Sequence, residues 1–150
     1  MSEQATTVLL ISGPNLNLLG EREPEIYGSE TLDVHVATAT RAAERNGLTL
    51  NHIQSNHEGE LIEAIQQARH SAGSIVINAG AFSHTSWAIH DALKSFDGPV
   101  VELHLSNPAA REEFRHLSVI APVADGTVAG FGNLGYDLAI DAVARLLKQK

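Results

Sequence analysis

The chain has 150 residues, of which 43% are hydrophobic and 19% charged, a size and composition typical of one globular domain. Its net charge of −8 and its total of only 10 lysine and arginine residues argue against a nucleic-acid partner, which needs clustered positive charge. No apolar stretch approaches the roughly 20 residues of a membrane span, so we expect no membrane association. The absence of cysteine, and of a signal peptide in the first residues MSEQATT, favours a cytoplasmic protein.

Short runs rich in Val, Ile and Leu alternate along the chain with segments of helical period. Strands are predicted over residues 7–11, 48–53, 75–77 and 100–105, and a weaker fifth strand over 117–120. Helices are predicted over residues 32–43, 61–68, 87–93 and 134–147. This alternation predicts an α/β, flavodoxin-like three-layer fold with a central parallel sheet of about five strands and helices on both faces.

Single residues predict where the first helix begins and ends, and where a further helical turn begins. Thr31 is a candidate cap for the first helix, and Asn46-Gly47 is a typical stop signal after it. Pro108 favours a short helical turn of its own.

Four of the predicted strands are followed by unusual polar sequences. These segments are residues 13–17, 54–58, 78–84 and 104–107. A single Asn or Ser before a helix is more often a structural cap than a ligand-binding residue. The carboxyl ends of parallel strands meet at one rim of the sheet, however, so four such segments together predict a binding site at that rim.

The connection over residues 12–30 is longer than ordinary strand-to-helix loops, and loops of this length often cover active sites. It carries Arg22 and Tyr27. From the residues alone, Tyr27 could equally be a packing residue and Arg22 a member of an exposed ion cluster.

Glu102 and His104 share one face of a nominal core strand, where a charge is costly unless it is paired. Three interpretations follow from the residues. The strand end is solvated, or Glu102 pairs with a cation such as Arg111, or Glu102 and His104 form a structural pair.

Four blocks of the sequence together resemble those of the type II 3-dehydroquinate dehydratases. They are GPNLNLLG at residues 13–20, REPEIYG at 22–28, QSNHEGE at 54–60 and ELHLSN at 102–107. Such long, ordered strings are far more specific than a short motif. The resemblance implies dehydration of 3-dehydroquinate to 3-dehydroshikimate by anti elimination through an enolate, with no cofactor, no metal and no covalent imine.

The resemblance also implies a cellular role and an assembly. The reaction would belong to the shikimate pathway, which supplies chorismate and the aromatic amino acids, or to quinate metabolism. Residues 1–150 would form a single catalytic domain, and the chain would assemble as a homododecamer built from trimers.

The matching motifs carry expected roles for individual residues. Tyr27 would be the base that removes the proton next to the ketone, Arg22 the cation beside it, and His104 the acid that protonates the leaving hydroxyl. Asn15 would hold a water against the enolate oxygen. The remaining expected site residues are Asn78, His84, Asp91 and Arg115 for the substrate hydroxyls, the backbone N–H groups of Leu105 and Ser106 for its carboxylate, Glu102 to orient His104, and Arg111 to order the long loop.

The chain departs from the family at two positions. The family usually has Pro where this chain has Ala79, and often Tyr where it has Phe82. Ala79 leaves the backbone beside Asn78 less restricted, which bears on substrate affinity more than on the chemistry.

A tyrosine base has to be ionised. An ordinary phenol is about one part in a thousand phenolate at pH 7, so a bias of roughly 3–4 kcal/mol toward the anion is needed. One cation at roughly 4 Å and an effective dielectric near 20 supplies about 4 kcal/mol, and desolvation opposes it. An imine mechanism is disfavoured because the lysines, Lys94, Lys148 and Lys150, lie late in a helix or at the C-terminus.

Three other functional classes remain open on the residues alone. A flavin-binding electron carrier shares the predicted fold, but Pro14 and Leu16 do not suit its phosphate cradle. A metal-dependent hydrolase is suggested by eight histidines, although His35, His70 and His116 are expected on exposed faces. A non-enzymatic binding module for small acids would use the same rim residues without chemistry.

Overall fold

The computed structural model describes residues 2–149, which are arranged around one five-stranded sheet. The strands are β1 (Thr7–Ser12), β2 (Thr49–Gln54), β3 (Ser74–Asn78), β4 (Val100–His104) and β5 (Gly126–Ala129). They lie in the order β2-β1-β3-β4-β5, and each neighbouring pair is parallel. The predicted flavodoxin-like α/β fold with a parallel sheet of about five strands is confirmed.

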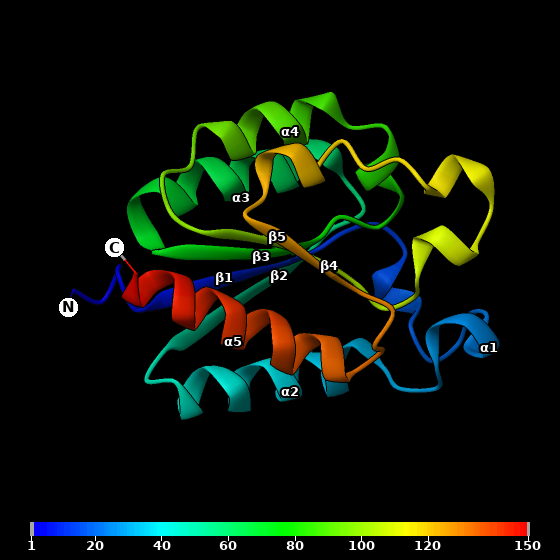
Figure 1. Cartoon of the computed structure of the whole chain (residues 1–150), viewed down its shortest axis with the longest axis horizontal. Helices are drawn as coiled ribbons and strands as arrows, with labels where there is room; N and C mark the ends of the chain where they lie inside the picture. The colour runs from blue at the N-terminus through cyan, green and yellow to red at the C-terminus, as the bar shows by residue number, and fades with distance from the viewer. Residues whose placement is uncertain (1, 150) are drawn as a thin grey trace.

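Four helices cover the two faces of the sheet. The helices α2 (Leu32–Arg45) and α5 (Leu134–Lys148) lie on one face, and α3 (Glu58–Ser71) and α4 (Trp87–Lys94) on the other (Figure 1). The four predicted helices are therefore confirmed. The predicted cap of α2 is also confirmed, because the Thr31 hydroxyl accepts a hydrogen bond from the N–H of Val34, and Gly47 has a φ of 71° just after the helix.

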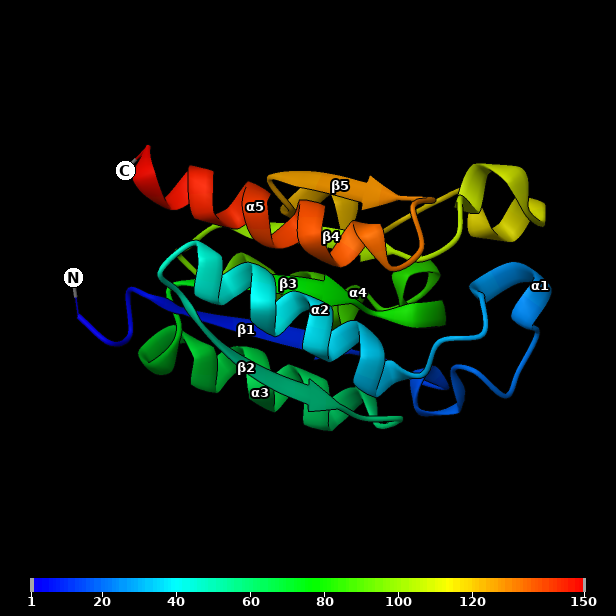
Figure 2. The ribbon, with the colours of Figure 1, turned by 90° about the horizontal axis from the view of Figure 1, so that it is seen from below.

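A one-turn helix that the sequence did not predict, α1 (Pro24–Tyr27), lies within the long connection after β1. It stands beyond the carboxyl ends of the strands, at the opposite end of the molecule from the two chain termini (Figures 1 and 2). The 3₁₀ turn Pro108–Ala110, which was predicted, lies at the same end. Both segments thus flank the rim where the site was expected.

Side chains of each inner strand point alternately to the two helical layers, as the period of two in a strand requires. Val8 and Leu10 of β1 pack in the core on the side of α2 and α5. Ile11 of β1 and Ile75 of β3 pack in the core on the side of α3 and α4. Because both faces of β3 are covered, all five of its residues are buried, which explains its continuous apolar sequence.

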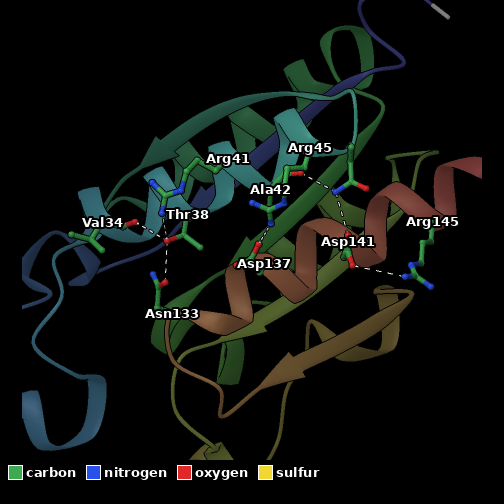
Figure 3. Close-up of polar contacts among 10 residues, drawn as sticks. Val34, Thr38, Arg41, Ala42, Arg45, Asn133, Asp137, Asp141 and Arg145 are labelled. Atoms are coloured by element: carbon green, nitrogen blue, oxygen red, sulfur yellow. Dashed lines mark hydrogen bonds and ion pairs between the residues drawn. The ribbon is translucent and has the colours of Figure 1, made fainter.

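Polar contacts link α2 to α5 along the edge of their interface (Figure 3). Arg45 of α2 donates to the carboxylate of Asp137 of α5, and the Thr38 hydroxyl donates to the side-chain oxygen of Asn133, 3.0 Å away. These contacts fix how the start of α5 meets α2 below the rim of the sheet.

The expected fifth strand over residues 117–120 is wrong. The Ser118 hydroxyl accepts hydrogen bonds from the N–H groups of Ile120 and Ala121 and so turns the chain, while the Val119 N–H is bonded to Ser83. The fifth strand is β5, a short edge strand of low apolar content that pairs only with β4.

The expectation that His35 is exposed is also wrong, whereas His70 and His116 are exposed as expected. His35 lies on the buried face of α2, and its ring stacks on Tyr136 of α5 with centroids 4.9 Å apart. Its Nδ1 accepts a hydrogen bond of 2.7 Å from the Asn133 amide, so its proton is on Nε2, which is buried without a partner. Burial lowers the pKa of His35, although the negative charge of Glu30 opposes this shift.

We predict that His35 makes the protein less stable in mild acid. As the pH falls below about 6.5, the unfolded chain takes up a proton on this residue that the folded chain resists, so the free energy of unfolding decreases. The variant His35→Gln should show a smaller decrease between pH 7.5 and pH 5.5 in urea unfolding. The control His70→Gln, at an exposed position of α3, should match the wild type, and equal slopes for all three proteins would contradict the prediction.

Candidate active site

A cavity of about 190 Å³ lies at the carboxyl ends of β1, β3 and β4. Three of the four polar segments noted in the sequence line it, together with the long loop after β1. The segment over residues 54–58 does not reach it. The predicted site residues that line the cavity are Asn15, Arg22, Tyr27, Asn78, His84, His104, Leu105, Ser106, Arg111 and Arg115.

Two predicted site residues lie outside this cavity. Glu102 is two residues before His104 in β4 and is buried. Asp91 lines a separate, open cavity beside α3 and α4, together with Arg69 and His70. Within one chain, Asp91 is therefore not brought to the other site residues.

Tyr27 lies beneath two guanidinium groups. The central carbon of Arg22 is 4.9 Å from the centre of its ring, and that of Arg111 is 5.0 Å from the same point. Arg111 also donates to the hydroxyl of Ser106, 3.3 Å away, which ties the long loop to the end of β4. Two like charges near one ring favour negative charge between them.

The chain has two tyrosines, and their surroundings differ. Tyr136 is fully buried, and burial raises its pKa to about 12, although the nearby Asn78 amide acts in the opposite direction. Tyr136 thus stays neutral at ordinary pH. Tyr27, which lines the cavity beside two cations, is the tyrosine available as a base.

His104 is paired with the buried carboxylate of Glu102. Its Nε2 donates to Oε2 of Glu102 over 2.9 Å, which leaves Nδ1 as the ring nitrogen available to a substrate. Burial raises the pKa of Glu102, but hydrogen bonds from His104, Ser118 and Thr127 outweigh it and hold the pKa below its ordinary value. Glu102 is therefore a buried carboxylate that accepts the N–H of His104 and fixes the orientation of the ring.

Among the three interpretations of Glu102, the pair with His104 is the one observed. The expected alternative pair with Arg111 is wrong, because Arg111 lies over Tyr27 and donates to Ser106. The partners Ser118 and Thr127 were missed by sequence reasoning, since one lies in a segment taken for a strand and the other in the strand that was not predicted.

His84 contributes an acceptor to the cavity. Its Nδ1 donates to the carbonyl oxygen of Leu117, 2.9 Å away, because a carbonyl oxygen can only accept. The neutral ring then presents Nε2 as an acceptor for a ligand hydroxyl. Phe114 packs edge-on against the ring and holds its orientation.

The cavity carries positive charge in an acidic protein. Arg22, Arg111 and Arg115 line it, and no Asp or Glu among residues 2–149 does so. Each of these arginines has an acidic neighbour on the outer side, Glu23 for the first and Glu112 for the other two. The arrangement suits an anionic ligand that also carries hydroxyl groups.

Neither an imine nor a metal site is apparent in the described part of the chain. Lys94 and Lys148 end their helices away from the cavity, and Lys150 lies outside the described residues. Residues 2–149 contain no group of three or more His, Asp or Glu side chains that could hold a metal ion. Within the same residues, every helix is too short or too polar to cross a bilayer.

Comparison with known proteins gives a consistent result. The family model described as dehydroquinase class II matches residues 6–144. The chain belongs to this family. Among its relatives, the 3-dehydroquinate dehydratase of Mesorhizobium japonicum is 54% identical over 142 residues, which are 94% of this chain and 99% of the relative. That of Corynebacterium glutamicum is 52% identical over 141 residues, 94% of this chain and 97% of the relative.

Solved structures of class II dehydroquinases share the fold closely. The type II dehydroquinase from Butyrivibrio crossotus has a TM-score of 0.89 at 44% identity, over 92% of this chain and 97% of that one. The type II dehydroquinase from Propionibacterium acnes has a TM-score of 0.89 at 42% identity, over 96% of this chain and 99% of that one. The family resemblance noted in the sequence is confirmed.

We predict that the charge on Glu102 stabilises the fold. The variant Glu102→Gln should lower the free energy of unfolding by about 2 kcal/mol at pH 7, because it weakens hydrogen bonds that a buried carboxylate accepts. Since the pKa of this carboxyl is lowered in the folded state, its contribution is complete above the ordinary value of 4.5 and is lost as the pH falls below it.

Urea unfolding of wild type and variant at pH 7 and pH 4 measures this effect. The exposed residue Glu63 on α3 provides the control Glu63→Gln, which should change stability little. A stability gap between wild type and Glu102→Gln that is as large at pH 4 as at pH 7 would show that the charge is not responsible.

Proposed function

We propose that the chain is a hydro-lyase that converts 3-dehydroquinate to 3-dehydroshikimate by anti elimination through an enolate, with Tyr27 as the base and His104 as the acid. The observation that carries the proposal is that one cavity holds a phenol beneath two guanidinium groups and a histidine bonded to a buried carboxylate. Membership of the class II dehydroquinases, and relatives named 3-dehydroquinate dehydratase, support the substrate.

Tyr27 removes the proton from the carbon next to the ketone. The guanidinium groups of Arg22 and Arg111 lie over the Tyr27 ring, and their positive charge favours negative charge on the phenol. The cost of removing a phenolate from water opposes this effect. Arg111 thereby gains a second role beyond ordering the loop.

The electrons of the broken C–H bond form an enolate, whose oxygen is negatively charged. Asn15 lines the cavity and holds a water that donates to this oxygen. The ketone then re-forms, the electron pair of the enolate C=C forms a new double bond between the deprotonated carbon and the carbon that carries the leaving hydroxyl, and the C–O bond to that hydroxyl breaks.

His104 supplies the proton that lets the hydroxyl leave as water. With Nε2 bonded to Glu102, its cationic ring gives up the proton on Nδ1. The Glu102 carboxylate stabilises the cation and fixes the ring. After product release, Tyr27 gives its proton to solvent and His104 takes up a proton from solvent, which restores the starting state.

The remaining cavity residues bind the substrate. Arg115 and the backbone N–H groups of Leu105 and Ser106 attract its carboxylate, and Nε2 of His84 with the Asn78 amide takes its hydroxyls. Asp91 has no role in this proposal within one chain, because it lines a different cavity.

The proposal needs no cofactor and differs from the alternatives in one observable. Pro14 and Leu16 line the cavity where a flavin carrier needs a hydroxyl- and glycine-rich cradle. A binding module for small acids would bind 3-dehydroquinate without consuming it. Appearance of the conjugated enone absorbance of 3-dehydroshikimate separates turnover from binding.

We further propose that the 150 residues act as one catalytic domain in the cytoplasm, in the shikimate pathway or in quinate metabolism. We also propose a homododecamer built from trimers. Large apolar side chains that are exposed on the single chain, including Trp87, Phe114 and Leu117, support a covered surface in the assembly.

We predict that Tyr27→Phe lowers kcat about 100- to 10,000-fold, because a positioned general base contributes about 10² to 10⁴ to the rate. The phenylalanine ring keeps its place beneath the two guanidinium groups, so the melting temperature and the binding of 3-dehydroquinate should change little. The enone assay and isothermal titration calorimetry measure the two effects. A folded variant with turnover near that of the wild type would remove Tyr27 from the mechanism.

We predict that Arg22→Lys lowers kcat about 100-fold, since a lysine at this position loses the planar contact with the Tyr27 ring and part of the bias toward the anion. The matched control is Arg145→Lys, at an exposed position of α5, which should retain wild-type kcat. Equal kcat values for the two variants would exclude Arg22 from catalysis.

A further inference from the structure

The polar segment after β2 does not reach the cavity, but it is bonded to a loop that does. Oδ1 of Asn56 accepts a hydrogen bond of 2.9 Å from the backbone N–H of Asn15. The side-chain amide of Gln54 donates both to Oδ1 of Asn56, at 3.2 Å, and to the carbonyl oxygen of Gly13, at 3.1 Å. Gln54 at the end of β2 and Asn56 just after it thus hold the loop at Gly13 and at Asn15.

The backbone of Asn15 is in the left-handed region, with a φ of 68°, which Asn enters more readily than other residues with a side chain. The N–H of Leu16 donates to the carbonyl oxygen of Gly13, 3.4 Å away, and closes a turn with Pro14 and Asn15 at its centre, where Asn suits a positive φ. The side chain of Asn15 makes no hydrogen bond that caps the following 3₁₀ turn, residues Leu16–Leu18. The turn therefore sets the backbone angles of Asn15, and contacts outside it set where Asn15 lies against the sheet.

Other contacts hold the neighbouring groups of the loop, and Asn56 holds the N–H of Asn15. Gly13 approaches β3 closely, since its N–H donates to Asn78 and a Cβ at this position would lie 2.4 Å from the carbonyl oxygen of Ala79. The carbonyl oxygen of Asn15 accepts from the N–H of Leu18, 3.0 Å away. In the preceding peptide, between Pro14 and Asn15, the N–H of Asn15 donates to Oδ1 of Asn56, which lies just after β2.

We infer that Asn56, held by Gln54, is a positioning residue that anchors the turn containing Asn15 at the end of β2 and so directs the Asn15 side chain to the enolate. This inference rests on the proposed function, in which Asn15 holds the water against the enolate oxygen. Asn56 touches neither substrate nor reacting atoms.

The position of Asn56 makes its effect separable from stability. Its side chain is exposed, so truncation leaves no cavity in the core. Asn15 acts where charge develops in the transition state, so misplacing it slows proton removal and leaves ground-state binding by the arginines intact. Truncation of Asn56 is therefore expected to lower kcat, to spare KM and to make proton removal more rate-limiting.

The test compares kcat, KM and the primary deuterium isotope effect for wild type and three variants. Asn56→Ala should lower kcat about 10- to 100-fold with KM changed by less than about twofold, and should raise the isotope effect for substrate deuterated at the abstracted position. Asn56→Asp keeps an oxygen that accepts from both donors and should stay within about threefold of wild type. The control His57→Ala, at the next exposed position, should behave as wild type.

A double variant shows whether Asn56 acts through Asn15. If it does, Asn15→Ala/Asn56→Ala is no slower than Asn15→Ala alone. The inference would be overturned if the losses of kcat in the two single variants multiplied in the double variant, or if Asn56→Ala kept the kcat of the wild type. It would also be overturned if Asn56→Ala had a lower kcat, a higher KM and a lower melting temperature together, which signals a merely structural role. Wild-type protein that produces no enone would instead refute the proposed function, and the inference with it.

Discussion

The guanidinium group of Arg111 joins the two halves of this site. It donates to Ser106 after β4 and lies over the ring of Tyr27, which comes from the long loop after β1. Arg22 lies over the same ring, so two positive charges that repel each other share one aromatic neighbour. The arrangement is stable where negative charge is present between them, which a phenolate provides. The same contact therefore connects the loop to the end of β4 and surrounds the proposed base with positive charge.

Three of the ten lysine and arginine residues of this acidic protein line one cavity, and no Asp or Glu in the described part of the chain lines it. The chain carries a net charge of −8, yet Arg22, Arg111 and Arg115 line the cavity. The buried carboxylate of Glu102 lies outside the cavity and is hydrogen-bonded to His104. Anions are thus attracted to the cavity and discouraged elsewhere on the surface. Two carboxylates on the outer side, Glu23 and Glu112, hold the arginines in place at the edge of the cavity.

Much of the fold follows from simple periodicities, and its exceptions have local causes. Buried parallel strands read as apolar runs, so the inner strands and the four long helices were predictable. The run over residues 117–120 looked like a strand but is turned by the hydroxyl of Ser118, and β5 is too short and too polar to stand out. His35 lies on the helical face of buried alanines, but its residue type suggested exposure.

The site was predictable where the parallel sheet brings segments together and less so where contacts depend on direction. Asn78 and His104 were expected at one rim because each lies at the carboxyl end of a predicted parallel strand, and both line the cavity. Asp91 lies outside the cavity of the single chain, so its expected contact with a substrate hydroxyl stays a prediction. The segment over residues 54–58 was expected at the site, and it acts on the loop of Asn15 instead of lining the cavity. Such contacts across elements need the folded chain.

The most direct test of the account is a crystal structure of the Tyr27→Phe variant with 3-dehydroquinate bound. The account predicts that the carbon next to the ketone lies within about 3.5 Å of the place of the missing phenolic oxygen, a distance at which transfer can occur. It also predicts that the leaving hydroxyl faces Nδ1 of His104 on the opposite side of the substrate ring. A bound substrate that presents this carbon to any other side chain, or its leaving hydroxyl away from His104, would contradict the account.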